Sequence, residues 1–178
     1  MRALIAAILV AGPALAADRP YAGQEMREIP SLSAEDIAAL EAGEGWGLAK
    51  PAELSGYPGP AHVLELAEDL ALTDAQLAEV QAIHDAMKAE ARRLGRDYIT
   101  AEAHVAMLFR EGHARPETLE GILGHSGRVL AELRAVHLKA HIATTPLLTA
   151  EQRETYDRLR GYGGADHDMT GHSGHGDH

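Results

Sequence analysis

Two long segments without helix-breaking residues constrain the fold of this chain more than any other feature. Residues 73–110 contain no proline and a single glycine, Gly95. Within them, one set of side chains recurs at alternating steps of seven, three and four residues, the spacing of one face of an amphipathic helix. The positions on this face are Leu77, His84, Met87, Ala91, Leu94, Tyr98, Ala101, Val105 and Leu108. At 1.5 Å per residue, such a helix extends roughly 55 Å and needs a partner along its length.

Residues 116–145 form the second such segment. Pro116 suits the first position of a helix, and Pro146 ends the segment because the residue before a proline is pushed out of helical geometry. The apolar face consists of Leu119, Ile122, Leu123, Val129, Leu130, Leu133 and Val136. The pattern breaks near residue 114, so we expect the two segments to form a long antiparallel helical hairpin. No stretch shows strand-like alternation, and the predicted fold class is therefore all-α.

The hairpin is flanked by shorter elements, which brings the predicted total to four to five helices. Residues 18–59 form an irregular N-terminal segment with one short helix, which Ser33 caps and which ends near Gly43. The stretch GEGWGLAKPAELSGYPGP that follows is rich in glycine and proline and is typical of a loop. We expect Trp46 and Tyr57 to hold this loop against the helices.

The N-terminus has the layout of a secretory signal peptide, residues 1–17. One positive charge at Arg2 precedes a short apolar run that ends in small residues around Ala16. This run is shorter than the roughly 20 apolar residues that span a bilayer. We expect cleavage after Ala16 or Ala17 and export to the periplasm without membrane insertion. An uncleaved anchor is the alternative.

Composition narrows the classes of partner and activity. The formal net charge is −11 and becomes −12 when Arg2 leaves with the leader, which disfavours nucleic acid as a partner and favours cations. The absence of cysteine excludes disulfide bonds and thiolate metal sites. There is no nucleophile motif, no glycine-rich phosphate loop and no HExxH signature, so we predict that the protein is not an enzyme.

Two short motifs bracket the hairpin, LTDAQ at its start and LTAEQ after it. In each, a threonine is placed to cap a helix and a glutamine to reach back to the threonine, as in a capping box. A short helix over residues 61–70 precedes the first motif, and a last helix over residues 149–160 begins with the second. The antiparallel hairpin brings both motifs to its open end, within a predicted domain of residues 60–161.

Paired LTxxQ motifs around a helical hairpin, behind an export signal, resemble the Spy/CpxP family of periplasmic proteins over roughly residues 60–160. The segment GWGLAKPAELSGYPGP also looks like that of the ZraP-like and CnrX-like members labelled heavy-metal sensors. This resemblance implies an exported, mostly dimeric four-helix protein without enzymatic activity. Some members are ATP-independent chaperones, and others bind or sense metal ions.

Two functions follow from the resemblance. The first is a periplasmic stress protein that binds Zn, Cu, Ni or Co for sensing, buffering or resistance, as a homodimer and with a membrane-bound sensor or anti-sigma partner. The alternative is a chaperone that holds unfolded periplasmic proteins, with or without modulation by metal. Chaperones of the family favour a basic concave face. The acidic net charge of this chain differs from that pattern. The cations available for such a face are Arg92, Arg93, Arg96, Arg128 and Arg134.

The candidate metal ligands begin with His137 and His141, which lie one helical turn apart, so that both imidazoles can reach one ion. Neutral imidazole suits Zn, Cu, Ni and Co. The CnrX-like resemblance implies metal ligands from facing helices, including a pair four residues apart on one helix. The hairpin register places three further candidates opposite: His84, Met87 and Glu90. The alternative interpretation is a solvated or half-buried histidine face, with Met87 as core packing and Glu90 as an exposed charge.

Two more groups are weaker candidates. Glu102, His104 and His125 meet across the hairpin by the same register, and the segment AEAHVAMLFR around Glu102 looks like one that recurs in metal-sensor members.

The C-terminal tail, residues 162–178, has no apolar face and is expected to be disordered. Its histidines are His167, His172, His175 and His178. Their composition predicts weak metal binding, and the alternative is a pH-sensitive solubilising tail.

Overall fold

The computed structural model describes residues 20–162. The predicted signal peptide with its cleavage site, and the predicted His-rich tail, lie outside the described residues except for Tyr162. Within the described part, the chain forms six α-helices, one 3-10 helix and no strand, which confirms the all-α prediction. No helix in residues 20–162 is long and apolar enough to cross a membrane.

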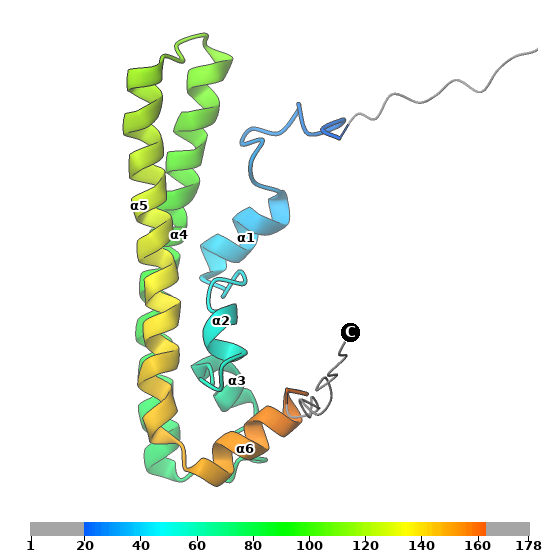
Figure 1. Ribbon diagram of the computed structural model, residues 1–178, viewed down its shortest axis with the longest axis vertical. Coiled ribbons are helices and arrows are strands. Elements are labelled where there is room, and N and C mark those ends of the chain that lie inside the picture. Colours follow the sequence, from blue (N-terminus) through cyan, green and yellow to red (C-terminus); the bar gives the residue numbers. More distant parts are fainter. Residues whose placement is uncertain (1–19, 163–178) are drawn as a thin grey trace, which may run out of the picture.

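The two longest helices, α4 (Asp74–Arg110) and α5 (Pro116–Thr144), pack side by side as an antiparallel hairpin (Figure 1). Their bounds differ from the predicted ones by one residue. Pro116 is the first residue of α5, where its missing N–H is not needed. A 3-10 helix, η1 (Thr145–Leu147), contains Pro146 and turns the chain away from the hairpin.

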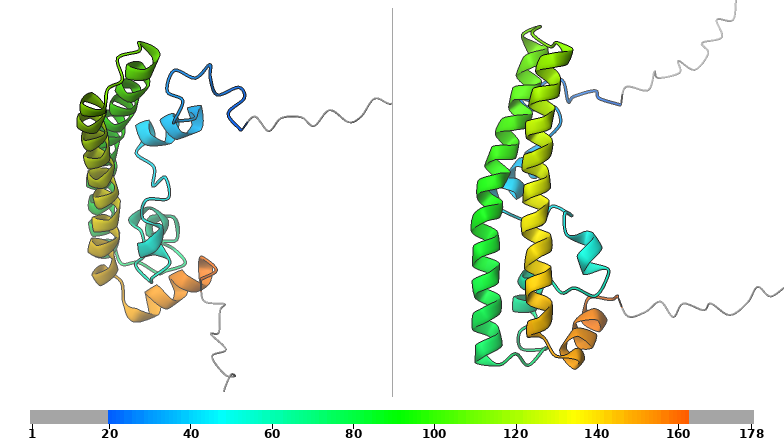
Figure 2. Two further views of the ribbon diagram at one scale, coloured as in Figure 1. Left: turned by 45° about the horizontal axis from the view of Figure 1, so that its top comes forward. Right: turned by 60° about the vertical axis from the view of Figure 1, so that its left-hand side comes forward.

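Four short helices lie along one side of the hairpin (Figures 1 and 2). They are α1 (Ala34–Ala42), α2 (Lys50–Glu53), α3 (Pro60–Glu65) and α6 (Ala150–Leu159). Helix α1 packs on α4, α2 on α5, and α3 on both long helices. Ser33 caps α1 as predicted, and Gly43 ends it in the left-handed conformation.

Two of the short helices differ from the sequence-based expectation. Helix α2 lies in the stretch predicted to be a loop: Pro51 stands in its first turn, where proline is compatible with a helix. Helix α3 ends at Glu65 instead of residue 70, and the turns that follow include Ala71 in the left-handed region, with φ 47°. We call residues 43–60, which cross the hairpin from α1 to α3, the strap.

Trp46 holds the strap as predicted, whereas Tyr57 does so in another way. The indole Nε1–H of Trp46 donates a hydrogen bond of 2.8 Å to Asp36 Oδ1, and its ring lies 6.0 Å from the ring of Tyr98. The ring of Tyr57 is exposed. Its backbone carbonyl makes the attachment instead, because it accepts a hydrogen bond from His141.

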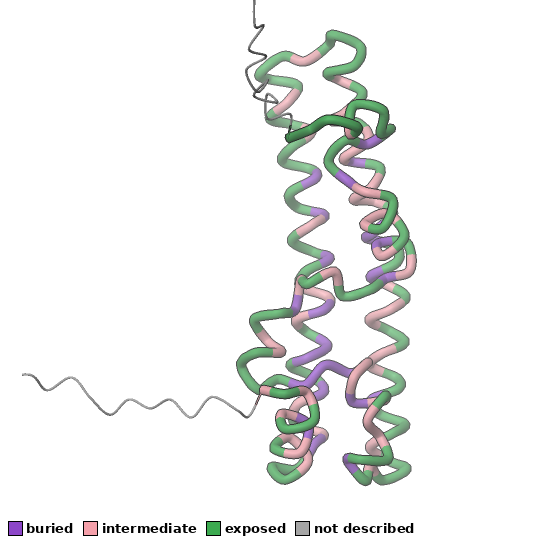
Figure 3. The backbone as a smooth tube through the Cα atoms, turned by 90° about the vertical axis from the view of Figure 1, so that its right-hand side faces the viewer, coloured by how far each residue is buried: buried purple, intermediate pink, exposed green. Residues whose placement is uncertain are grey.

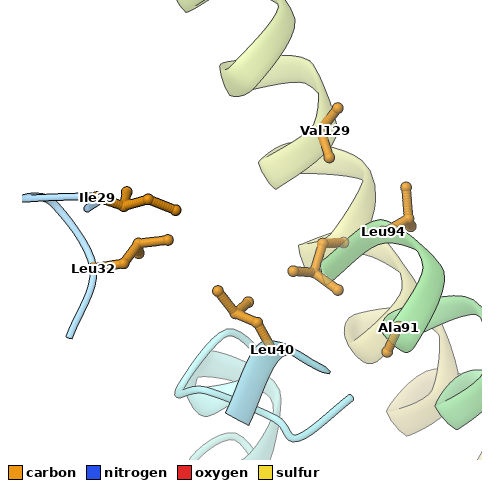
Figure 4. Close-up of a cluster of buried hydrophobic side chains, with 7 residues drawn as sticks. Ile29, Leu32, Leu40, Ala91, Leu94 and Val129 are labelled. Atoms are coloured by element: carbon orange, nitrogen blue, oxygen red, sulfur yellow. The ribbon is translucent and has the colours of Figure 1, made fainter. Parts of the chain in front are cut away.

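The apolar core consists of two separate clusters. The first joins the N-terminal segment and α1 to the middle of the hairpin, and Figure 4 shows most of it: Ile29, Leu32, Leu40, Ala91, Leu94, Val129 and Leu133. The second joins α3, α4 and α6 at the open end: Val63, Leu70, Val80, Leu148 and Tyr156. On α4 the clusters are separated by residues 81–90, and on α5 no residue after Val136 belongs to either cluster.

Burial confirms much of the predicted apolar face of α4 and corrects its first position. Ala91, Leu94 and Ala101 are buried as expected, and Figure 3 shows buried positions recurring along both long helices. Leu77, however, is 41% exposed, while Val80 is fully buried. The reason is that α3 and α6 pack against α4 on the side of Val80. The apolar periodicity of α4 alone does not show from which side other helices approach.

Candidate functional site

Two buried histidines on α5 lie in the gap between the apolar clusters. His137 is 2% exposed and His141 is 9% exposed. They stand one turn apart, so both rings project from the face of α5 that is covered by the rest of the protein. Buried imidazoles in the middle of a helical core are costly unless their ring nitrogens find partners. What each nitrogen contacts therefore decides what this region can do.

A pocket of about 450 Å³ brings four of the predicted ligands together. Both long helices and the strap contribute to its walls. The predicted ligands among its lining residues are His84 and Met87 on α4 and His137 and His141 on α5. His84 and Met87 therefore face the α5 histidines, as the antiparallel register predicts. His62 and Lys88 line the same pocket and were not predicted.

The strap fixes the orientation of the His141 ring. Nδ1 lies 2.7 Å from the backbone oxygen of Tyr57, and because a carbonyl oxygen only accepts, Nδ1 carries the proton and donates. The lone pair of the neutral ring is then on Nε2. Gly59 makes this position possible, since a Cβ there would lie 2.7 Å from His141 Cε1.

His84 has the same arrangement on the opposite helix. Its Nδ1 lies 3.2 Å from Asp85 Oδ1, and an ionised carboxylate only accepts, so Nδ1 donates and Nε2 is left with the lone pair. In metal sites, a hydrogen bond from one ring nitrogen to a carbonyl or carboxylate commonly orients the other nitrogen toward the ion. His84 and His141 both show this pattern.

His137 provides the test of whether the pocket fits a metal ion. Its Nε2 is buried and makes no hydrogen bond within the described part of the chain. Burial lowers the pKa of His137, and electrostatic interactions with His141 and with the Lys88 ammonium group lower it further, which favours the neutral ring. A buried polar atom without a partner costs about 1–3 kcal/mol. A transition metal ion would supply the missing partner, and in this respect the residues fit one.

The donors do not converge in the described structure. Within residues 20–162, no group of three or more His, Asp or Glu side chains stands close enough together to hold a metal ion. Glu90 lies outside the pocket, where its Oε1 is 2.6 Å from Arg93 Nη2. The hydrogen bond from Arg93 lowers the pKa of Glu90. Lys88 lines the pocket instead, and its charge opposes a bound cation, whereas Glu44 and Glu65 in the same lining favour one.

The second predicted group is not assembled. Glu102 is half-buried, and both of its oxygens are occupied: Oε2 accepts from the hydroxyl of Ser31 at 2.7 Å and Oε1 from that of Ser126 at 2.6 Å. His104 and His125 are exposed. Residues two apart on a helix point about 200° away from each other, so Glu102 and His104 face different sides. Glu102 ties the N-terminal segment to α5.

A buried hydrogen-bond network around Glu53 was missed by the sequence analysis. Glu53 Oε1 accepts from the hydroxyls of Tyr156 at 2.6 Å and Tyr162 at 3.2 Å, and from Arg160 Nε at 3.3 Å. Burial, together with the hydrogen bond to Glu53, raises the pKa of Tyr156. The network joins α2 to α6. Glu53 lies in the stretch predicted to be a loop, and the only available signal was the helical spacing of Tyr156 and Arg160.

The same carboxylate reaches the histidine pair. Glu53 Oε2 is buried, makes no hydrogen bond within the described residues, and lies 3.7 Å from His141 Nδ1. A second pocket, of about 410 Å³, is lined by Glu53, His62, His141 and Tyr162. His141 therefore stands between the two pockets and connects the Glu53 network with the candidate metal ligands.

The two LTxxQ motifs meet at the open end of the hairpin, as predicted. Both capping boxes are formed, with Thr73 and Thr149 each accepting from the backbone N–H of the glutamine three residues on. Gln76 Nε2 donates to Gln152 Oε1 at 2.8 Å, and Gln152 Nε2 lies 3.2 Å from Gln76 Oε1. The paired motifs thus form one junction between α4 and α6.

A family model described as LTXXQ motif family protein matches residues 61–160, which includes both motifs. The chain belongs to the LTXXQ motif family. This membership supports the Spy/CpxP-type resemblance, and LTXXQ proteins are generally periplasmic and are not known enzymes. No curated protein and no solved structure matches the chain.

Proposed function

We propose that this LTXXQ protein is an exported periplasmic protein that binds a transition metal ion, Zn, Cu, Ni or Co, in the histidine pocket. It is then of the ZraP-like and CnrX-like heavy-metal kind. The observation that carries the proposal is the pocket between the two apolar clusters: it is lined by His84, Met87, His137 and His141, and His137 Nε2 is buried there without a partner.

The donor types favour transition metals over Mg or Ca. Imidazole nitrogen suits Zn, Cu, Ni and Co, and thioether sulfur suits Cu(I), whereas Mg and Ca prefer oxygen ligands. Tyr57 and Asp85 orient His141 and His84 so that Nε2 carries the lone pair in each. These hydrogen bonds are the outer contacts that a metal-ligating histidine requires.

Binding has to draw the donors together. His84 and Met87 are only partly buried, so their side chains can rotate without opening the core, at a cost in side-chain entropy. His137 and His141 are buried and already share one face of α5. The α5 pair is therefore the fixed half of the site, and the α4 residues are the adjustable half.

The tail and the partners extend the proposal. The histidines of residues 163–178 would add weaker, less selective binding, because ordering a flexible chain costs entropy. We propose a homodimer that buffers the metal or reports it to a membrane-bound sensor or anti-sigma partner. Such a partner would read the metal-dependent position of the strap, which contacts His141 directly.

Calorimetric titration with Zn, Cu, Ni and Co tests the proposal. Two proteins are compared, both starting at residue 18: the full chain and one that ends at Tyr162. We expect one binding event that survives removal of the tail and is lost in the His137→Asn, His141→Asn double variant. The exposed His104 and His125 provide the matched control, a double variant to Asn with unchanged binding. Binding that disappears with the tail would refute the pocket as the metal site.

The chaperone alternative is favoured by apolar side chains near the turn of the hairpin. Met107, Phe109 and Leu123 are 42%, 59% and 48% exposed. The expected basic face is weakened, however, because Arg93 pairs with Glu90 and Asp97. A holdase would suppress aggregation of an unfolded client with a chelator present, and Phe109→Ser would lower that suppression. Because Phe109→Ser leaves the histidine pocket unchanged, the same variant should still bind metal, and a metal titration therefore separates the two functions.

A further inference from the structure

A third pocket, an apolar cleft edged by positive charge, lies between the strap and α5. Its volume is about 520 Å³. Trp46, Leu48 and Leu54 of the strap and Leu130 of α5 form the apolar walls, and Lys50 and Arg134 provide the charge. None of the residues that line it also lines the histidine pocket. The cleft is therefore a separate feature that metal binding does not explain.

The strap holds Trp46 rigidly at this cleft. Its backbone is in the left-handed region, with φ 43°, and Gly47 follows with φ 70°; a bulky residue adopts this conformation only where the surroundings impose it. The indole N–H is already bonded to Asp36, and Tyr98 packs beside the ring. What Trp46 offers the cleft is therefore apolar ring surface.

The two cations at the cleft lack ion-pair partners among the described residues. Lys50 is the first residue of α2, Arg134 lies on α5, and both are exposed. Neither forms a salt bridge within residues 20–162, although Asp and Glu outnumber Lys and Arg by 27 to 16 in the chain. A guanidinium and an ammonium group beside apolar walls complement a carboxylate that carries an apolar chain.

Leu54 shows that the apolar surface is open to a ligand. Its side chain is 59% exposed, although it lines this cleft and the adjoining pocket that contains Glu53. The volume of the cleft falls within the roughly 300–1,000 Å³ of small-molecule sites. A single hydrocarbon chain with one charged end matches both the size and the division into apolar and cationic parts.

We propose that this cleft binds a free fatty acid. Arg134 and Lys50 hold the carboxylate, and the hydrocarbon chain lies against Trp46, Leu54 and Leu130. The cleft shares no lining residue with the histidine pocket, so fatty-acid binding is tested with a chelator present. Its outcome does not depend on whether the protein binds metal.

The test uses sodium dodecanoate below its critical micelle concentration, with the full chain. Trp46 is the only tryptophan and lines both the cleft and the adjoining pocket that contains Glu53, so its emission reports a ligand in either, and the variants below assign the signal to the cleft. We expect a saturable blue shift and one site per chain by calorimetry. Butyrate, which has the carboxylate without the long chain, and dodecanol, which has the chain without the charge, are each expected to bind at least about tenfold more weakly.

Variants at exposed positions separate the ligand contacts from folding. Arg134→Gln and Lys50→Gln together should weaken dodecanoate binding about tenfold or more, and Leu54→Ser should also weaken it. Lys139→Gln is the matched control, because Lys139 is an exposed cation on α5 that does not line the cleft. Circular dichroism confirms that each variant is folded. The proposal is overturned if wild-type emission does not saturate, or if the double variant binds dodecanoate as tightly as Lys139→Gln does.

Discussion

The side-chain amides of Gln76 and Gln152 bond to each other across 76 positions of sequence. Each also donates to a backbone carbonyl that lies just before the threonine of the other motif. Gln76 Nε2 donates to Leu147 O at 2.8 Å, and Gln152 Nε2 donates to Leu70 O at 3.1 Å. Each glutamine oxygen accepts from the backbone N–H of the threonine that caps its own helix. Each glutamine therefore completes the cap of its own helix and also forms hydrogen bonds with the other motif.

Removal of either glutamine should destabilise the protein. Gln76→Ala leaves the carbonyl of Leu147, and Gln152→Ala that of Leu70, without its side-chain donor, and we expect the free energy of unfolding to fall by about 1–3 kcal/mol. Because the two residues share hydrogen bonds, the double variant should lose less than the sum, by at least about 0.5 kcal/mol. Urea unfolding measures both. Gln81→Ala is the control, since Gln81 is exposed and bonds only to Asp85; strict additivity would refute the coupling.

Gly95 on α4 marks the closest approach of a second helix. A Cβ at this position would clash with the backbone oxygen of Leu40 in α1. In a free helix, Gly→Ala stabilises by about 0.5–1 kcal/mol. Here we expect Gly95→Ala to destabilise by about 1–3 kcal/mol, because the backbone of α1 has to move.

The matched control is Gly127→Ala on α5, where a Cβ would meet nothing within 4 Å. This variant should gain the stability that a helical alanine normally brings. Thermal and urea unfolding of both variants test the prediction. A Gly95→Ala protein as stable as Gly127→Ala would show that α1 does not pack on α4 in this way.

The hairpin could be predicted from the sequence because its signals are local and repeated: an uninterrupted 3.6-residue period, two capping boxes and prolines at both limits of α5. The position of His84 and Met87 opposite the α5 histidines could also be predicted, since antiparallel register follows from the position of the turn. The contacts made by the strap could not be predicted from the sequence. They depend on how a glycine-rich segment with a one-turn helix crosses the hairpin, which determines the partners of Glu53 and of Tyr57 O.

The failure of the second metal group has a different cause. Counting across the hairpin predicts which residues are level with one another, but not which way each side chain points. Glu102 points inward to Ser126, while His104 and His125 point to solvent. The neighbouring serine occupies the position that the register had assigned to His125.

The metal-free protein should lose stability in mild acid because of His137. Burial lowers the pKa of His137 in the folded state, whereas in the unfolded chain it is about 6.5. The unfolded state then binds more protons, so the stabilisation is complete above about pH 6.5 and is lost as pH falls below that value toward the folded pKa. Urea unfolding at pH 7.5 and pH 5, with a chelator, should show this loss.

His137→Gln removes the titrating group and should flatten the pH dependence. His104→Gln, at an exposed position, should leave it as steep as in the wild type. If His137→Gln loses as much stability between the two pH values as His104→Gln does, His137 is not the group that makes the fold acid-sensitive.

Lys88 should limit metal affinity. Its ammonium group lines the histidine pocket and repels a cation. Lys88→Leu removes the charge, keeps most of the apolar stem and adds no metal-binding atom, so we expect metal to bind several-fold more tightly by calorimetry. Lys139→Leu, at an exposed position of α5 outside the pocket, should not change the affinity. An unchanged or weaker affinity in Lys88→Leu would place the metal elsewhere.

Anomalous scattering at the metal absorption edge, from crystals of the protein ending at Tyr162 soaked in Zn, Cu, Ni or Co, would locate the bound ion. We predict a peak between α4 and α5, about 2.0–2.1 Å from Nε2 of His137 and His141, with His84 or Met87 turned toward it. A peak at the exposed histidines alone, or a pocket in which both α5 imidazoles remain uncoordinated at saturating metal, would contradict it.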